Sequence, residues 1–138
     1  MPGVKGRVLV VDDSRVMRQL IRVNLELEGY QVVTANDGVE CLELVHQVSP
    51  DLVTLDIVMP RLDGTHTARR LRADPLTARL PLVMVSAGVE GGDVASAAGA
   101  VDAFLSKPFE PSELLRTVRE LIRPAVVRRV GASVPTQG

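Results

Sequence analysis

The chain has 138 residues, 46% of them hydrophobic and 24% charged, and its net charge at pH 7 is −1. This length favours one compact domain, the single cysteine excludes an intrachain disulfide, and the lack of any run of 18 apolar residues argues against a membrane span. The small net charge, the single tyrosine and the lack of tryptophan argue against direct nucleic-acid binding by charge or by base stacking.

The first predicted elements are a buried strand and an amphipathic helix. Residues 7–11 (RVLVV) are a continuous apolar run, which is typical of a strand buried on both faces. Two acids follow this run where a secretory signal would have small residues, so we expect a cytoplasmic protein. Ser14 is the expected N-cap of the first helix, and Gly29 ends it. The apolar positions of this helix share one face: Val16, Leu20, Val23 and Leu27.

The rest of the chain repeats this alternation of strand and helix. Asp37 and Glu40 have the spacing of a capping box for a second helix that extends to about Gln47. The remaining predicted elements are strands at 30–35, 52–55, 82–85 and 101–105 and helices at 64–73, 88–99 and 111–122. Four glycines interrupt the stretch 88–99, so that helix is expected to be short and labile. Pro124 is expected to close the last helix.

Five strand–helix units predict an α/β fold, in which helices cover both faces of a parallel sheet. Right-handed crossovers reduce the arrangement to a doubly wound, five-stranded sheet, where ligands bind outside the carboxyl ends of the strands. We expect residues 1–123 to form this domain. Residues 124–138 have no strong periodicity and are expected to form a C-terminal tail or linker.

Polar side chains stand where four of the predicted strands end. Asp12 and Asp13 follow the first strand, Asp56 the third, Ser86 the fourth and Lys107 the fifth. Three crowded carboxylates repel one another unless a cation separates them, and Mg²⁺ prefers oxygen ligands of this kind. An ammonium and a hydroxyl beside one carboxylate complete a phosphoryl-transfer site, in which Asp56 is the expected nucleophile.

Each of these residues also has an ordinary structural interpretation. Asp12 and Asp13 could simply stabilise the N-terminus of the first helix, and Ser86 could be a helix cap. Asp56 could belong to a turn, and Lys107 could be a solvated charge. The functional interpretation is favoured because all five residues are expected at one edge of the sheet, which core packing does not require.

Four segments at the ends of predicted strands occur in a fixed order: VLVVDDS, DLVTLDIVMPRLDG, LVMVSA and AFLSKPF. Together they resemble the receiver domains of bacterial response regulators in two-component signalling, over about residues 6–122. The resemblance implies a flavodoxin-like (βα)5 fold with strand order 2-1-3-4-5. It also implies a signalling phosphoacceptor that catalyses only its own phosphotransfer and dephosphorylation.

The resemblance further implies a role for each residue of the site. Asp56 would accept the phosphoryl group, and Lys107 would contact it. Asp13, Asp56 and the backbone carbonyl of Val58 would bind Mg²⁺ directly, while Asp12 would act through water. The family also often has a cis peptide after the lysine, which here precedes a proline.

A conformational switch and its partners are implied in the same way. Ser86 would move toward the phosphate, and Phe104 would turn inward behind it. The face built from the fourth helix, the fifth strand and the last helix would then change. The implied partners are a sensor histidine kinase or phosphotransfer protein, a downstream effector protein or domain, and a second copy of the chain in a phosphorylation-dependent homodimer.

Three positions depart from the family pattern. Val58 and Gly88 stand where relatives often carry polar side chains that orient an attacking water, so we expect slow loss of the phosphoryl group. Phe104 has no hydroxyl, so the switch cannot use a tyrosine hydrogen bond.

Three other functions fit part of the sequence. A metal-dependent phosphatase with an aspartate nucleophile would need an acid in place of Val58 and also a cap domain. A nucleotide- or flavin-binding domain would need a glycine-rich turn where Asp12, Asp13 and Ser14 stand. A receiver kept for interaction alone would lack site residues, all of which are present here; failure to bind Mg²⁺ would favour it.

Overall fold

The structure, a computed structural model, describes residues 5–57, 59, 61–86 and 99–133, with residues 123–133 described by their backbone alone. The strands are β1 (Arg7–Val11), β2 (Gln31–Ala35), β3 (Leu52–Asp56), β4 (Leu82–Ser86) and β5 (Ala103–Ser106). The helices are α1 (Arg15–Leu27), α2 (Gly38–Val48), α3 (Gly64–Ala73) and α5 (Pro111–Ser133). Neighbouring strands are parallel in the order β2-β1-β3-β4-β5. The predicted fold class and strand order are therefore confirmed, while the helix predicted at 88–99 falls outside the described residues apart from its last position.

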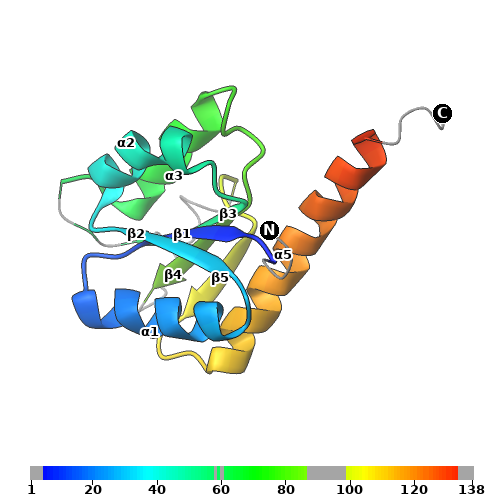
Figure 1. Ribbon diagram of the computed structural model, residues 1–138. Coiled ribbons are helices and arrows are strands. Elements are labelled where there is room, and N and C mark those ends of the chain that lie inside the picture. The colour runs from blue at the N-terminus through cyan, green and yellow to red at the C-terminus, as the bar shows by residue number, and fades with distance from the viewer. Residues whose placement is uncertain (1–4, 58, 60, 87–98, 134–138) are drawn as a thin grey trace.

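The sheet lies between two layers of helices, with α2 and α3 on one face and α1 and α5 on the other (Figure 1). Alternate residues of a strand enter opposite layers. In β1, Leu9 and Val11 pack with the buried side chains of α2 and α3, whereas Val8 and Val10 pack with those of α1 and α5. A strand covered on both faces has to be apolar at every position, which explains the continuous apolar runs in the sequence.

Helix α1 buries a different face from the one predicted. Its buried residues are Ile21 and Leu25, and Met17 packs against the same core from a partly buried position. The predicted stripe is exposed instead, with relative exposures between 44% and 79%: Val16, Leu20, Val23 and Leu27. The helix has two apolar stripes, and a helical period is present in both. Only contact with the sheet decides which of them is the core face.

Side-chain caps begin three of the helices. Ser14 Oγ accepts the N–H of Met17 at 3.2 Å, as predicted for the N-cap of α1. Asp37 Oδ1 accepts the N–H of Glu40 at 2.9 Å, which confirms this pair at the start of α2. Asp63 caps α3 in the same way. Each cap satisfies an N–H group that has no partner within its helix.

Helix α5 does not end at Pro124, and the predicted end at Ile122 is therefore wrong. The helix continues to Ser133, and its C-terminal part extends away from the sheet (Figure 1). A proline inside a helix removes one backbone hydrogen bond and crowds the preceding turn, but it does not prevent helical residues after it. Up to Ile122, α5 is held by buried contacts of Leu114, Val118 and Ile122.

No helix in the described ranges is both long enough and apolar enough to cross a membrane.

Candidate functional site

Three carboxylates meet at the carboxyl edge of the sheet. Asp12 follows β1 directly and Asp56 is the last residue of β3, while the preceding residues Val11 and Leu55 are register partners on these neighbouring strands. Asp12, Asp13 and Asp56 each offer an oxygen that lies within 4.8 Å of the other two. Asp12 and Asp56 are buried, whereas Asp13 is exposed. The structure therefore brings together the three acids that the sequence placed at this edge.

The turn from β1 into α1 holds Asp12 in place. Its Oδ1 accepts the N–H of Ser14 at 2.9 Å, its N–H donates to the carbonyl oxygen of Ala35 at 3.2 Å, and Arg18 Nη1 donates to its carbonyl oxygen at 2.8 Å. The cap of α1 is Ser14, so capping does not account for the two acids before it. The other oxygen of Asp12 is free of the turn and faces Lys107.

Lys107 supplies a cation among these acids. Its Nζ lies 3.1 Å from Asp12 Oδ2 and 3.5 Å from Asp56 Oδ1, and 16% of its side chain is exposed. The residue follows β5, and its N–H donates to the carbonyl oxygen of Ser86 at 2.7 Å. The peptide bond from Lys107 to Pro108 is cis, as the family resemblance implied. The ammonium thus lies beside Asp56, as expected, and closer still to Asp12.

Of the remaining predicted residues, the structure describes Ser86 and Phe104. Ser86 is buried at the end of β4, and β3 and β4 are neighbours in which Asp56 pairs with Val85. Phe104 lies in β5 and packs, partly buried, against the core beneath α2 and α3. Val58 and Gly88 fall outside the described residues.

The start of α3 comes very close to the phosphoacceptor candidate. A side chain in place of Gly64 would collide with the carbonyl oxygen of Asp56. The N–H of Gly64 donates to the carbonyl oxygen of Ile57 at 2.8 Å. The glycine of the segment DIVMPRLDG is therefore required by packing, because it lets the chain return to the strand end that it has just left.

Electrostatics at Asp56 favour a bound cation. Burial, the charge of Asp12 and, to a smaller extent, that of Asp13 together raise the pKa of Asp56 to about 6, although Lys107 lowers it. A divalent cation would relieve this repulsion, because it favours the ionised form of every carboxylate around it. The three oxygens are hard ligands at close spacing, so the residues present fit Mg²⁺.

Comparison with known proteins places this arrangement in a family. Residues 8–119 match the family model of the response regulator receiver domain. The chain belongs to this family. Two solved receiver domains have closely similar structures. That of a signal transduction histidine kinase from Syntrophus aciditrophicus has a TM-score of 0.81 at 28% identity, covering 86% of this chain and 91% of the other. The chemotaxis protein CheY4 of Vibrio cholerae has a TM-score of 0.79 at 29% identity, covering 83% and 97%.

Relatives in sequence carry regulator names. The response regulator MprA of Mycobacterium leprae is 42% identical over 124 residues, which cover 85% of this chain and 51% of MprA. The DNA-binding dual master transcriptional regulator RpaA of Synechocystis is 38% identical over 118 residues, which cover 85% of this chain and 49% of RpaA. This receiver domain thus spans about half the length of the curated relatives that it matches.

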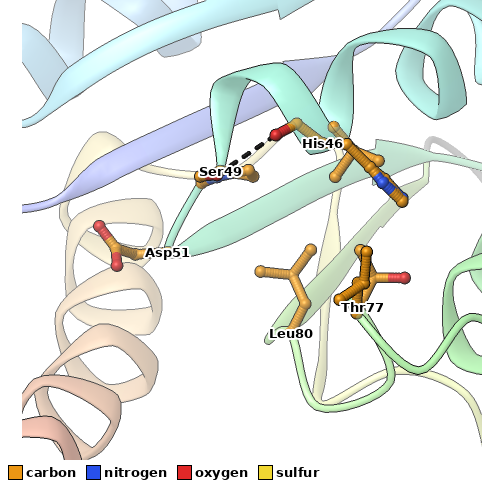
Figure 2. A pocket seen from close by; sticks show the side chains of 8 residues that line it. His46, Ser49, Asp51, Thr77 and Leu80 are labelled. Carbon is orange, nitrogen blue, oxygen red and sulfur yellow. Dashed lines mark hydrogen bonds between the residues drawn. The ribbon is translucent and has the colours of Figure 1, made fainter.

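A cavity of about 300 Å³ lies at the opposite edge of the sheet, beside the amino ends of β3 and β4. Figure 2 shows it between the end of α2 and the segment that leads into β4, with Ser49 Oγ donating to the carbonyl oxygen of His46. His46 Nε2 also lies 2.8 Å from Asp74 Oδ2. The cavity lies away from the carboxylates and contributes nothing to the receiver site. Sequence reasoning did not find it, because its lining comes from two segments that lie apart in the sequence, residues 45–51 and 76–80.

Proposed function

We propose that this receiver domain accepts a phosphoryl group on the carboxylate of Asp56, from a histidine kinase, a phosphotransfer protein or a small phosphodonor. The observation that carries the proposal is the position of Lys107 Nζ, 3.1 Å from Asp12 and 3.5 Å from Asp56, beside three converging acids. A carboxylate oxygen of Asp56 attacks phosphorus, and the bond from phosphorus to the donor breaks. The donor leaves with that electron pair, and an acyl phosphate remains on the protein.

In this proposal Asp13, Asp56 and the backbone carbonyl of Val58 would hold Mg²⁺, and Asp12 would contact it through water. The ion would neutralise charge on the phosphoryl oxygens during transfer. Lys107 contributes a second, fixed positive charge on the same oxygens, and the Ser86 hydroxyl donates a hydrogen bond to one of them. Phosphoryl transfer depends on positioning and charge more than on proton transfer, so these groups are sufficient to promote the transfer to Asp56.

The proposed output is a change at β5 and the helix after it. Phe104 lies one strand away from Ser86 and packs into the core next to β4, so a shift of Ser86 toward phosphate can be transmitted through β5. The changed face would bind an effector protein or domain, or a second copy of the chain. Slow dephosphorylation is part of the proposal, because neither Val58 nor Gly88 can orient an attacking water.

The phosphodonor protein is expected to dock on α1. This helix begins close to the acidic site, and its exposed apolar stripe has no partner among the described residues: Val16, Leu20, Val23 and Leu27. Three arginines of the same helix line a small cavity beside β2: Arg15, Arg18 and Arg22. A donor with an apolar helical surface edged by acids would match this face of the receiver domain.

The phosphoacceptor is tested by incubating the chain with acetyl phosphate and Mg²⁺ and measuring its intact mass. Wild type is expected to gain one phosphoryl group, while Asp56→Asn and wild type with excess chelator gain none. Labelling of Asp56→Asn at the wild-type rate would refute the proposal.

The α1 surface is tested with Leu20→Ser, which should slow transfer from a histidine kinase that phosphorylates wild type and leave labelling by acetyl phosphate unchanged.

A further inference from the structure

An ion pair outside the carboxylate cluster joins α2 to the loop between β3 and α3. Arg61 Nε lies 2.7 Å from Asp37 Oδ2, and Arg61 Nη2 lies 3.1 Å from Asp37 Oδ1. The side chain of Asp37 is 9% exposed, and its Oδ1 also accepts the N–H of Glu40 at the start of α2. The Arg61 bond lowers the pKa of Asp37 from its ordinary value. A two-point contact on a buried carboxylate fixes geometry better than an exposed single-point pair does.

The backbone of Arg61 is held in an uncommon conformation. Its φ is 68°, in the left-handed region that residues with a side chain rarely adopt. This conformation costs conformational energy. In this conformation the guanidinium of Arg61 contacts Asp37.

The loop and the start of α2 also touch directly. A side chain in place of Gly38 would collide with Thr67 Oγ1 and with the carbonyl oxygen of Leu62. Leu62 and Thr67 therefore pack directly against the start of α2. Arg61 contacts the same part of α2 through its ion pair with Asp37, so packing and charge both hold Arg61 and Leu62 there.

The same corner of the molecule is tied to the first strand. The carbonyl oxygen of Ala35, two residues before Asp37, accepts the N–H of Asp12 at 3.2 Å. The N–H of Asn36 donates to Glu40 Oε1 at 2.6 Å, which closes the turn between β2 and α2. Residues 35–40 thus connect the strand end that carries Asp12 with the loop that follows Asp56.

We propose that Asp37 and Arg61 are positioning residues for Mg²⁺. They touch neither the ion nor the phosphoryl group. They hold Arg61 and Leu62, which follow Asp56 in the chain, beside the turn whose Ala35 accepts the N–H of Asp12. The inference rests on the proposed function, since it assumes that Mg²⁺ binds at these acids. Residues that orient metal ligands from behind commonly change metal affinity when they are replaced.

The test is a titration of the full chain with Mg²⁺, in which the NMR chemical shifts of the backbone amides report binding. Asp37→Asn keeps an N-cap oxygen for α2 and removes the ion pair. Arg61→Ala removes the pair from the other side, and Arg61→Gly does so while relieving the left-handed backbone. Each variant should weaken Mg²⁺ binding by about ten-fold. The double variant Asp37→Asn with Arg61→Ala should be no weaker than the singles, because the two groups act as a unit.

A second measurement separates positioning from general damage. The rate of labelling by acetyl phosphate is measured against Mg²⁺ concentration. The half-saturating concentration should rise by the same factor as the dissociation constant, while the rate at saturating Mg²⁺ stays at the wild-type value. Matched controls are Asp74→Asn, which alters the contact of Asp74 with His46 at the opposite edge, and Arg70→Ala on the exposed face of α3. Both controls should bind Mg²⁺ as wild type does.

The results would separate failure of the positioning role from failure of the proposed phosphorylation. Unchanged Mg²⁺ affinity in Arg61→Gly and Asp37→Asn, in a wild type that binds the ion, would overturn the inference alone. A lower rate at saturating Mg²⁺, with the half-saturating concentration unchanged, would overturn it too. A wild type that binds no Mg²⁺ and takes no label would overturn the proposed function as well.

Discussion

Burial and neighbouring charge work against ionisation at Asp56. They raise its pKa to about 6 in the folded protein, against 3.8 as the ordinary value. The folded state therefore binds this proton more tightly than the unfolded chain does, so the ionised carboxylate destabilises the metal-free protein at neutral pH.

We expect Asp56→Asn to raise the unfolding free energy of the metal-free protein by about 1–2 kcal/mol at pH 7.5. The difference is fully present above pH 6 and should disappear as the pH falls from about 6 to about 4, where wild type is protonated as well. Urea denaturation at several pH values measures it, with Glu120→Gln on α5 as an exposed control. A wild type at least as stable as Asp56→Asn without Mg²⁺ would contradict this account.

Thr54 is a second residue whose polar group costs stability. It lies in the middle of β3, is 1% exposed, and its Oγ1 is the buried side-chain polar atom without a hydrogen bond in the described part of the chain. Thr54→Val keeps the shape and removes the hydroxyl, so we expect a gain of about 1 kcal/mol. Thr67→Val is the matched control: its Oγ1 donates to the carbonyl oxygen of Asp63 at 2.7 Å, so the same change should lose about 1 kcal/mol. Equal effects of the two changes on thermal unfolding would rule out this explanation.

At the scale of the element, α1 separates a core stripe from a surface stripe of similar composition. Leu25 is fully buried and Leu27 is 79% exposed, although both belong to apolar periods of the same helix. We expect Leu25→Ala to cost about 2–4 kcal/mol, and Leu27→Ala to stay within about 0.5 kcal/mol of wild type. Chemical denaturation compares them, and a large loss in Leu27→Ala would show that this stripe is covered.

At the scale of the whole molecule, the domain boundary stays a prediction. The buried contacts of α5 that the structure describes end at Ile122, while the helix backbone continues to Ser133. We expect a chain truncated after Arg123 to keep its fold, with an unfolding free energy within about 1 kcal/mol of the full chain. Acetyl phosphate labelling should proceed at the same rate. A loss of several kcal/mol in thermal or urea unfolding would move the boundary of the receiver domain into residues 124–138.

The two edges of the sheet have different roles across the molecule. The carboxyl edge gathers Asp12, Asp56 and Lys107 from strands β1, β3 and β5, which are far apart in the sequence. The amino edge carries the cavity of Figure 2 and the His46–Asp74 pair. A parallel sheet produces this division, because all of its strands end on the same side.

The local pattern of the chain was enough to predict the alternation of strands and helices, the class of sheet and the list of acids at the strand ends. These follow from apolar runs and helical periods, which are local properties of the chain. It also determined the caps at Ser14 and Asp37, because a cap depends on residues within one turn. The resemblance in four ordered segments supplied the strand order.

Three features could be seen only in the folded molecule: which stripe of α1 is buried, where α5 ends, and that Arg61 contacts Asp37. The first depends on which side of the helix meets the sheet, and two apolar stripes of similar period cannot be ranked without that contact. The second depends on how far the helix backbone continues beyond the body of the domain. The third joins residues 24 positions apart through a left-handed backbone, and no local rule of sequence predicts such a pairing.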